Sequence, residues 1–192
     1  AKATEDPSYI ECAERCGLVM STRMATVDGG FFALFDIDAD RPFTDSGSWS
    51  VQAEVHQLKV GLAFLELFEA TGRGEFQHAT QALRKWCLRR HESFLSTDEP
   101  APDKIVSQVY AYACFLEGLL PVAALEQDSA RALQFGILQI ENLLGEYSEE
   151  YQRCDVIAQL LRLRLYADNY GVMELDYNSA AEEAAVVEAF QM

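Results

Sequence analysis

Acidic side chains are concentrated in one stretch of this chain, and their spacing allows two kinds of chemistry. Asp36, Asp38, Asp45 and Glu54 lie within twenty residues of one another, and Asp155 opens a helix-like stretch much later. Two carboxyl groups on either side of a bond can act as general acid and general base or nucleophile. Carboxylates can also bind a hard cation such as calcium. Both readings place the chemistry in the long segment that contains the aspartates.

The positions of the aspartates limit the kind of calcium site that this segment could form. Asp36, Asp38 and Asp40 alternate as the first ligands of an EF-hand loop do, but such a loop requires Gly at its sixth position and Glu at its twelfth. Here Arg41 and Gly47 occupy those positions, so an EF-hand is excluded. A calcium site of another kind stays open beside the simpler reading, a solvated loop. We expect no metal and no cofactor.

The overall charge limits the partners. The chain has 192 residues, 49% of them hydrophobic, and a formal net charge of −16. Nucleic acid and anionic membrane surfaces are excluded as partners, since both require basic surface. Acidity of this kind serves solubility, or marks an acidic cleft for neutral sugars or cations. No apolar run reaches the length of about 18 residues that a membrane span requires.

The five cysteines favour a reducing compartment. They stand at positions 12, 16, 87, 114 and 154, mostly within helical apolar patterns. Their odd number and placement predict buried, reduced thiols in a cytoplasmic protein. Cys12 and Cys16 share one helix face, but no second pair at ligand spacing completes a zinc site.

The elements that must position the acidic residues are helices of two kinds. The apolar periodicity predicts helices over residues 8–26, 50–70, 75–94, 103–125, 128–147, 153–166 and 179–192. Residues 31–49 are expected to be a non-helical, functional loop. Ser48 or Ser50 is expected to cap the second helix, Gly72 to end it, and Ser179 with Glu182 to form a capping box.

Apolar and amphipathic helices alternate along this order, and that alternation predicts two layers. Three helices, opening near Val55, Val109 and Val156, are apolar on most faces and belong inside, whereas the helices that follow the first two are amphipathic and belong outside. A hairpin pattern that returns about every 40–50 residues is typical of stacked or closed helical arrays. The N-terminal ends of the inner helices are then expected to share one face.

Several runs of residues resemble a known superfamily. They are Asp-Gly-Gly-Phe at 28–31, the helix opening at 45–52, the helix end at 68–73, Trp86, and the helical runs at 111–120 and 153–163. Together these runs, over about residues 8–192, resemble the six-hairpin glycosidase-like α/α-toroid superfamily. The resemblance implies an all-α toroid with a saccharide-binding funnel at the inner-helix N-termini, where acidic residues perform acid–base catalysis. Since the chain holds about three and a half hairpins, we expect an open arc or a piece of a longer toroid.

The resemblance and the helix layout together assign the site. Asp45, Asp155 and Glu54 are the expected catalytic carboxyl groups, and eight residues are expected to bind substrate: Asp36, Asp38, Trp49, Gln52, His56, Gln108, Tyr112 and Gln159. The alternative is that Asp45 and Asp155 are helix caps or first-turn acids and that the amides satisfy buried backbone groups. His56 could be a base, a donor to a sugar, or a core histidine.

Two functions follow from these expectations. The first is a carbohydrate-binding or carbohydrate-processing, glycosidase-like module formed by a single domain over residues 1–192. The second is a non-catalytic helical repeat that binds a protein partner. An open arc would leave apolar helix faces uncovered, so self-association is also expected.

Overall fold

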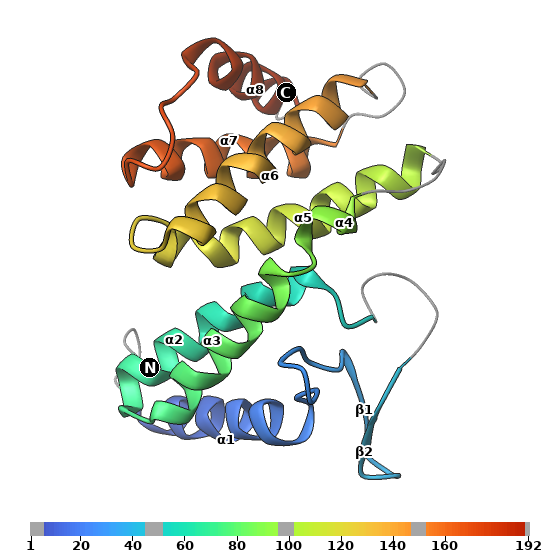
Figure 1. Ribbon diagram of the computed structural model, residues 1–192, viewed down its shortest axis with the longest axis vertical. Coiled ribbons are helices and arrows are strands. Elements are labelled where there is room, and N and C mark those ends of the chain that lie inside the picture. Colours follow the sequence, from blue (N-terminus) through green and yellow to red (C-terminus); the bar gives the residue numbers. More distant parts are fainter. Residues whose placement is uncertain (1–5, 45–51, 96–101, 147–152, 191–192) are drawn as a thin grey trace. The chain divides into compact units, whose positions relative to one another are not determined.

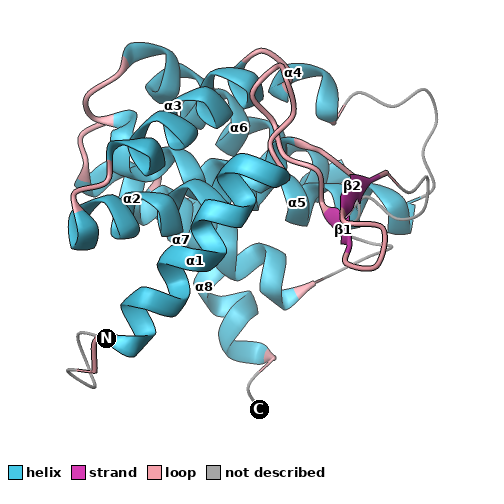
Figure 2. Cartoon of the chain, turned by 90° about the horizontal axis from the view of Figure 1, so that it is seen from below, coloured by secondary structure: helices cyan, strands magenta, loops and turns pink. Residues whose placement is uncertain are grey.

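The computed structural model describes residues 6–44, 52–95, 102–146 and 153–190. The protein is mostly α-helical, as predicted, with one short antiparallel hairpin of strands (Figures 1 and 2). The chain divides into two compact units, Ala1–Arg89 and Arg90–Met192. No described helix has the length and the apolar character that crossing a membrane demands.

The first unit combines three α-helices with the strand hairpin and a short 3-10 helix. Its elements are α1 (Ser8–Arg23), β1 (Leu34–Asp36), β2 (Arg41–Phe43), η2 (Val55–Lys59), α2 (Val60–Thr71) and α3 (Gly74–Leu88). Phe64 of α2 forms the aromatic centre of the core, since its ring lies 5.7 Å from that of Phe31 and 5.9 Å from that of Phe76 between centroids. Helices α2 and α3 form an antiparallel pair joined at Gly72, whose φ of 71° confirms the predicted glycine cap.

The Asp-Gly-Gly turn after α1 is held against α3 by its backbone and side chains. Asp28 accepts a hydrogen bond from the indole nitrogen of Trp86 at 2.9 Å. Gly29 has a φ of 103°, and a Cβ on Gly30 would stand 2.8 Å from the Trp86 ring. Only glycine therefore lets the backbone approach the indole so closely. The structure thus gives these residues a packing role.

The described part of the acidic loop is non-helical, as predicted, whereas the second helix begins later than predicted. Within the expected loop, β1 and β2 pair antiparallel, and Asp40 turns the chain between them with a φ of 55°. The helix predicted from residue 50 starts instead as the 3-10 helix Val55–Lys59, preceded by Glu54 in an extended conformation. Short 3-10 segments are common at helix N-termini because they can form with few residues. The predicted caps Ser48 and Ser50 lie outside the described residues.

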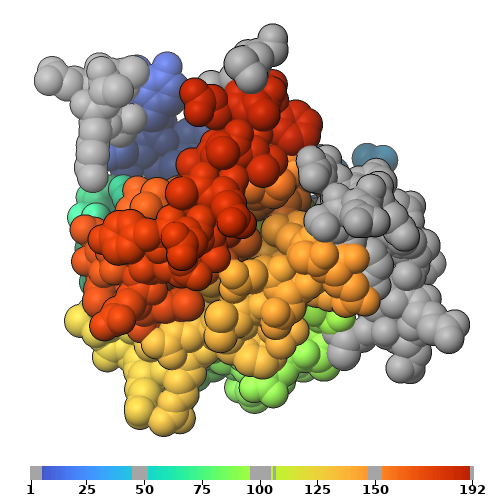
Figure 3. Space-filling view, turned by 90° about the horizontal axis from the view of Figure 1, so that it is seen from above, coloured from blue at the N-terminus to red at the C-terminus, as the bar shows by residue number. Residues whose placement is uncertain are grey.

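The second unit is built from two helical hairpins. It contains the short α4 (His91–Phe94), then α5 (Pro102–Ala123), α6 (Gln127–Glu146), α7 (Cys154–Asn169) and α8 (Tyr177–Ala189). Helix α5 is buried on every face over residues 111–120, as predicted for an inner helix. Helix α6 buries one face only, as predicted for an outer one. The space-filling view shows α6, α7 and α8 covering one face of this unit (Figure 3).

Helices α5 and α7 run parallel. Near their N-terminal ends the Arg153 guanidinium lies over the ring of Tyr110, and further along Arg162 pairs with Glu117. Because both contacts advance in the same direction along the two helices, the N-terminal ends of α5 and α7 lie at the same end of the unit. This unit therefore has the repeated hairpins that the sequence pattern predicted. Closure into a toroid stays an expectation.

Two local predictions were wrong. Helix α8 is capped by Asp176, which accepts hydrogen bonds from the backbone N–H groups of Asn178 and Ser179, and not by Ser179. An aspartate one turn earlier satisfies the same orphan donors. Cys12 and Cys16 are exposed, whereas Cys87 and Cys114 are buried as expected. Both exposed thiols lie on α1, which is covered along only part of its surface.

Candidate functional site

Polar side chains from two separate hairpins gather at the N-terminal ends of α5 and α7. Gln108 and Tyr110 come from α5, while Arg153, Asp155 and Gln159 come from the start of α7. Contacts join Tyr110, Arg153 and Asp155, while Gln108 and Gln159 lie in the N-terminal halves of the same two parallel helices. Gln108, Asp155 and Gln159 are three of the residues that the sequence predicted for the site.

Asp155 is a charged acceptor at this site. Its carboxylate accepts a hydrogen bond of 3.0 Å from Nε of Arg153, and half of its side chain is exposed to solvent. The hydrogen bond from Arg153 lowers the pKa of Asp155 below its ordinary value. The group is therefore ionised at neutral pH, which suits a hydrogen-bond acceptor, a base or a nucleophile better than a general acid.

Arg153 connects the two helices. Its guanidinium lies 5.3 Å from the centroid of the Tyr110 ring while its Nε and terminal nitrogen bind Asp155. A cation over an aromatic face and a bidentate bond to a carboxylate hold this long side chain in one geometry. Three side chains are thereby fixed in relation to one another across α5 and α7.

Gln159 adds a hydrogen-bonding group to the same helix face. It follows Asp155 by four residues, so the two side chains lie one turn apart on α7. The oxygen Oε1 of Gln159 is buried and has no hydrogen-bond partner among the residues that the structure describes. A buried acceptor of this kind normally receives a hydrogen bond from water or a ligand.

Tyr112 lies deeper than the rest of the predicted site. Its side chain is fully buried, and its hydroxyl is 2.9 Å from Nδ1 of His91. Burial raises the pKa of Tyr112 and lowers that of His91, so both groups are neutral. The rings of Phe94 and Phe115 stack around them. A role for Tyr112 in binding substrate stays a prediction.

The remaining candidates belong to the first unit. Gln52, Glu54 and His56 are half-buried around the start of η2, and burial lowers the pKa of His56 to about 4, so its ring is neutral at physiological pH. Asp36 is half-buried and accepts a hydrogen bond of 2.9 Å from the backbone N–H of Ala39. Asp38 is exposed in the same turn.

Two of the expected site residues, Asp45 and Trp49, lie outside the described residues. The catalytic role of Asp45 and the stacking role of Trp49 stay predictions. Within the four described ranges, no three His, Cys, Asp or Glu side chains stand close enough to hold a metal ion together.

Sequence reasoning missed Tyr110 and Arg153. Arg153 occupies the N-cap position of α7, two residues before Asp155, and Tyr110 lies two residues after Gln108. An arginine two residues before a first-turn aspartate is a signal that could have pointed to the pair. The contact with Tyr110 could be found only once α5 and α7 were known to be parallel.

Comparisons with known proteins identify no relative of this chain. No model of a known protein family, no curated protein and no solved structure matches this chain.

Proposed function

We propose that this chain binds a neutral saccharide at the N-terminal ends of α5 and α7. The observation that carries the proposal is the cross-helix group of Tyr110, Arg153 and Asp155, with Gln159 one turn further along. Sugars are recognised by hydrogen bonds to their hydroxyl groups and by contact with aromatic rings. The group places a charged acceptor, a guanidinium and an aromatic ring next to one another across the two helices.

The charge of the protein agrees with a neutral ligand. With a net charge of −16, the chain would repel a polyanionic glycan. Neutral oligosaccharides are therefore the substrate class of the proposal.

Glycoside hydrolysis would require more than binding. The reaction uses two carboxyl groups, about 5–5.5 Å apart for retention or about 6.5–9.5 Å apart for inversion of the anomeric centre. Asp155 is one of the three predicted carboxyl groups, and its low pKa fits the base or nucleophile. Asp45 and Glu54, the other two predicted carboxyl groups, belong to the first unit, and their catalytic role stays a prediction. Catalysis extends the binding proposal, and its failure would leave that proposal intact.

Binding can be measured by calorimetry and thermal shift. We expect one class within a panel of neutral gluco-, manno-, galacto- and xylo-oligosaccharides to raise the melting temperature of the full chain. Asp155→Asn and Gln159→Leu should each weaken binding about tenfold, equal to ~1.4 kcal/mol. The matched control is Glu188→Gln, which removes an exposed carboxylate of α8 far along the chain.

The outcomes separate binding from catalysis. If no sugar in the panel binds, or if both variants bind as tightly as the unchanged chain, the proposal is wrong. Release of reducing ends that is lost in Asp45→Asn or Glu54→Gln, with binding kept, would support hydrolysis. Binding without any release would limit the function to recognition.

A further inference from the structure

The first unit contains an open groove between α1 and α2. Its volume is about 880 Å³, which lies in the upper part of the usual range for ligand-binding sites. The described residues that line it come from these two helices: Tyr9, Ile10, Ala13, Cys16, Gly17 and Met20 from α1, and Val60, Ala63, Phe64, Glu66, Leu67, Glu69 and Ala70 from α2. The groove is separate from the residues of the proposed saccharide site.

The walls of the groove are small and apolar. Ala13, Cys16, Ala63 and Ala70 are exposed, and Gly17 lies between the helices where a Cβ would stand 2.7 Å from Leu67. Small side chains on both walls let another backbone approach closely. A groove of this form between two helices suits a third helix, which would place residues at i, i+3, i+4 and i+7 along it.

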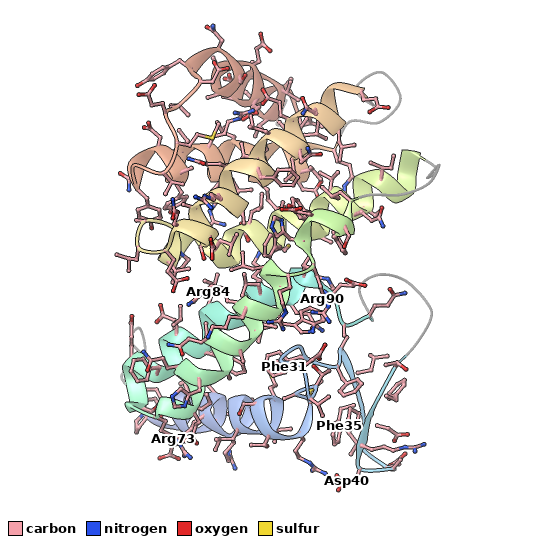
Figure 4. The ribbon with its side chains drawn as sticks, in the orientation of Figure 1. Phe31, Phe35, Asp40, Arg73, Arg84 and Arg90 are labelled. Atoms are coloured by element: carbon pink, nitrogen blue, oxygen red, sulfur yellow. The ribbon has the colours of Figure 1, made fainter. Side chains whose placement is uncertain are left out.

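The charges at the groove have one sign. Glu66 and Glu69 are the only charged residues among those that line it. The basic residue at its end, Arg73, is neutralised by Glu14 and Glu75, and its position beside α1 can be followed in Figure 4. The surface that surrounds the apolar walls therefore attracts basic side chains.

We propose that this groove binds an amphipathic helix of a partner protein, with an apolar face in the groove and lysine or arginine residues beside Glu66 and Glu69. Complementary charge selects this occupant over two others. A second copy of this chain would bring a net charge of −16 against the same acidic rim. A fatty acid would bring its own carboxylate next to the two glutamates.

The exposed aromatic residue at the edge of the groove supports an interface. Tyr9 has 57% of its surface exposed and lies at the start of α1. Tyrosine is enriched among the residues that contribute most to protein–protein binding, because it offers a large apolar surface and one polar tip. We expect Tyr9 to fold over the bound helix.

The test uses two designed peptides and the full chain. Both peptides are as long as α1, which has 16 residues, or roughly 24 Å as a helix. They share a leucine face, and one carries lysines beside it where the other carries glutamates. Fluorescence anisotropy should show binding of the lysine peptide only, weakened by added salt.

Two variants locate the binding in the groove. Ala63→Trp fills the groove from an exposed position and should abolish binding. Glu66→Gln with Glu69→Gln should weaken it about fivefold, as expected for two partly exposed charge pairs, and should reduce its salt dependence. The matched control is Glu182→Gln with Glu188→Gln, which removes two exposed charges from α8 and should leave binding unchanged.

Three results would overturn the proposal. The first is binding of the glutamate peptide as tightly as the lysine peptide. The second is binding that survives in Ala63→Trp when circular dichroism shows that this variant is folded. Sedimentation of the unmodified chain supplies the third result, since a dimer that Ala63→Trp dissociates would make a second copy the occupant.

Discussion

The helices of the two units are joined by different kinds of contact. In the second unit, a buried charge joins three successive helices: Arg164 of α7 is 3% exposed and contacts Glu183 of α8 at 2.8 Å and Glu141 of α6 at 3.0 Å. In the first unit, aromatic rings and closely approaching glycines join the helices. The first unit also leaves the groove between α1 and α2 open.

This difference separates two ways of specifying a helix arrangement. A buried arginine with two carboxylate partners tolerates only the geometry that satisfies it, since an unpaired charge in the interior is costly. Close packing at glycine depends on shape alone. We therefore expect the second unit to respond most to loss of a charge and the first unit to respond more mildly to changes in side-chain size.

The largest effect is expected at Arg164. Its replacement in Arg164→Ala leaves the half-buried Glu183 and its partner Glu141 without the guanidinium, and we expect the free energy of unfolding to fall by about 3 kcal/mol. Urea denaturation followed by circular dichroism measures the change. Arg164→Met with Glu183→Leu should recover much of the loss, and failure to recover any of it would show that the charges are not the cause.

A matched pair of glycines sharpens the comparison further. In α6, a Cβ on Gly136 would collide with Leu116 and stand 3.0 Å from Tyr112, both fully buried. We expect Gly136→Ala to cost about 2 kcal/mol. A Cβ on Gly17 would stand 2.7 Å from Leu67 and 2.8 Å from the buried Phe76. Gly17→Ala should cost about 1 kcal/mol, because Leu67 borders the groove and can move.

The control for this pair is Gly145→Ala, also in α6. Among the described residues, no atom outside its own helix backbone lies within 4 Å of a Cβ at this position, so the higher helix propensity of alanine should raise stability by about 0.5–1 kcal/mol. Thermal denaturation of the three variants measures the order. Equal losses at positions 17 and 136 would contradict the contrast between the units.

The cap of α8 is expected to contribute less than these core positions. Asp176→Ala removes the acceptor for two backbone N–H groups, and we expect a loss of about 1 kcal/mol. Asp176→Asn keeps the acceptor and should keep most of the stability. Hydrogen exchange in the first turn of α8 distinguishes loss of the cap from a general weakening of the unit.

At neutral pH the smallest effect is expected at His56 in the first unit. Burial lowers its pKa in the folded protein to about 4, while the unfolded chain has a pKa of about 6.5. The unfolded state therefore binds the proton first, so stability is complete above about pH 6.5 and declines as the pH falls toward the folded pKa. His56→Gln should flatten this decline in urea denaturation across that range. Parallel curves for both proteins would contradict the assignment.

The sequence predicted the helices well because the spacing of apolar residues along a helix shows which of its faces are buried. The apolar run at 111–120 lies in the fully buried α5, and the one-sided pattern of 128–147 lies in the amphipathic α6. Helix starts were less predictable, since several polar residues can serve as a cap. Asp176 and Ser179 were both suitable, and tertiary contacts of Ser179 with Glu141 favour its place inside the first turn.

The candidate site was predictable in part for a related reason. Gln108, Asp155 and Gln159 could be chosen because residues in the first two turns of parallel inner helices lie toward the same end of a layer. The contact of Arg153 with Tyr110 depends on the distance between two helices that are separated by the whole of α6. The groove depends on how far α1 covers α2, which the pattern of either helix alone does not specify.

The hairpin order of the second unit has a consequence for the way the protein is made. Helix α5 packs most extensively on α6, and α7 on α8, so each pair consists of neighbours along the chain. Local topology of this kind favours fast folding, and chains are synthesised from the N-terminus. The α5–α6 hairpin can therefore form at the ribosome before α7 has been translated. Glu117 is then already part of a folded hairpin when α7 emerges, and it can form its ion pair with Arg162.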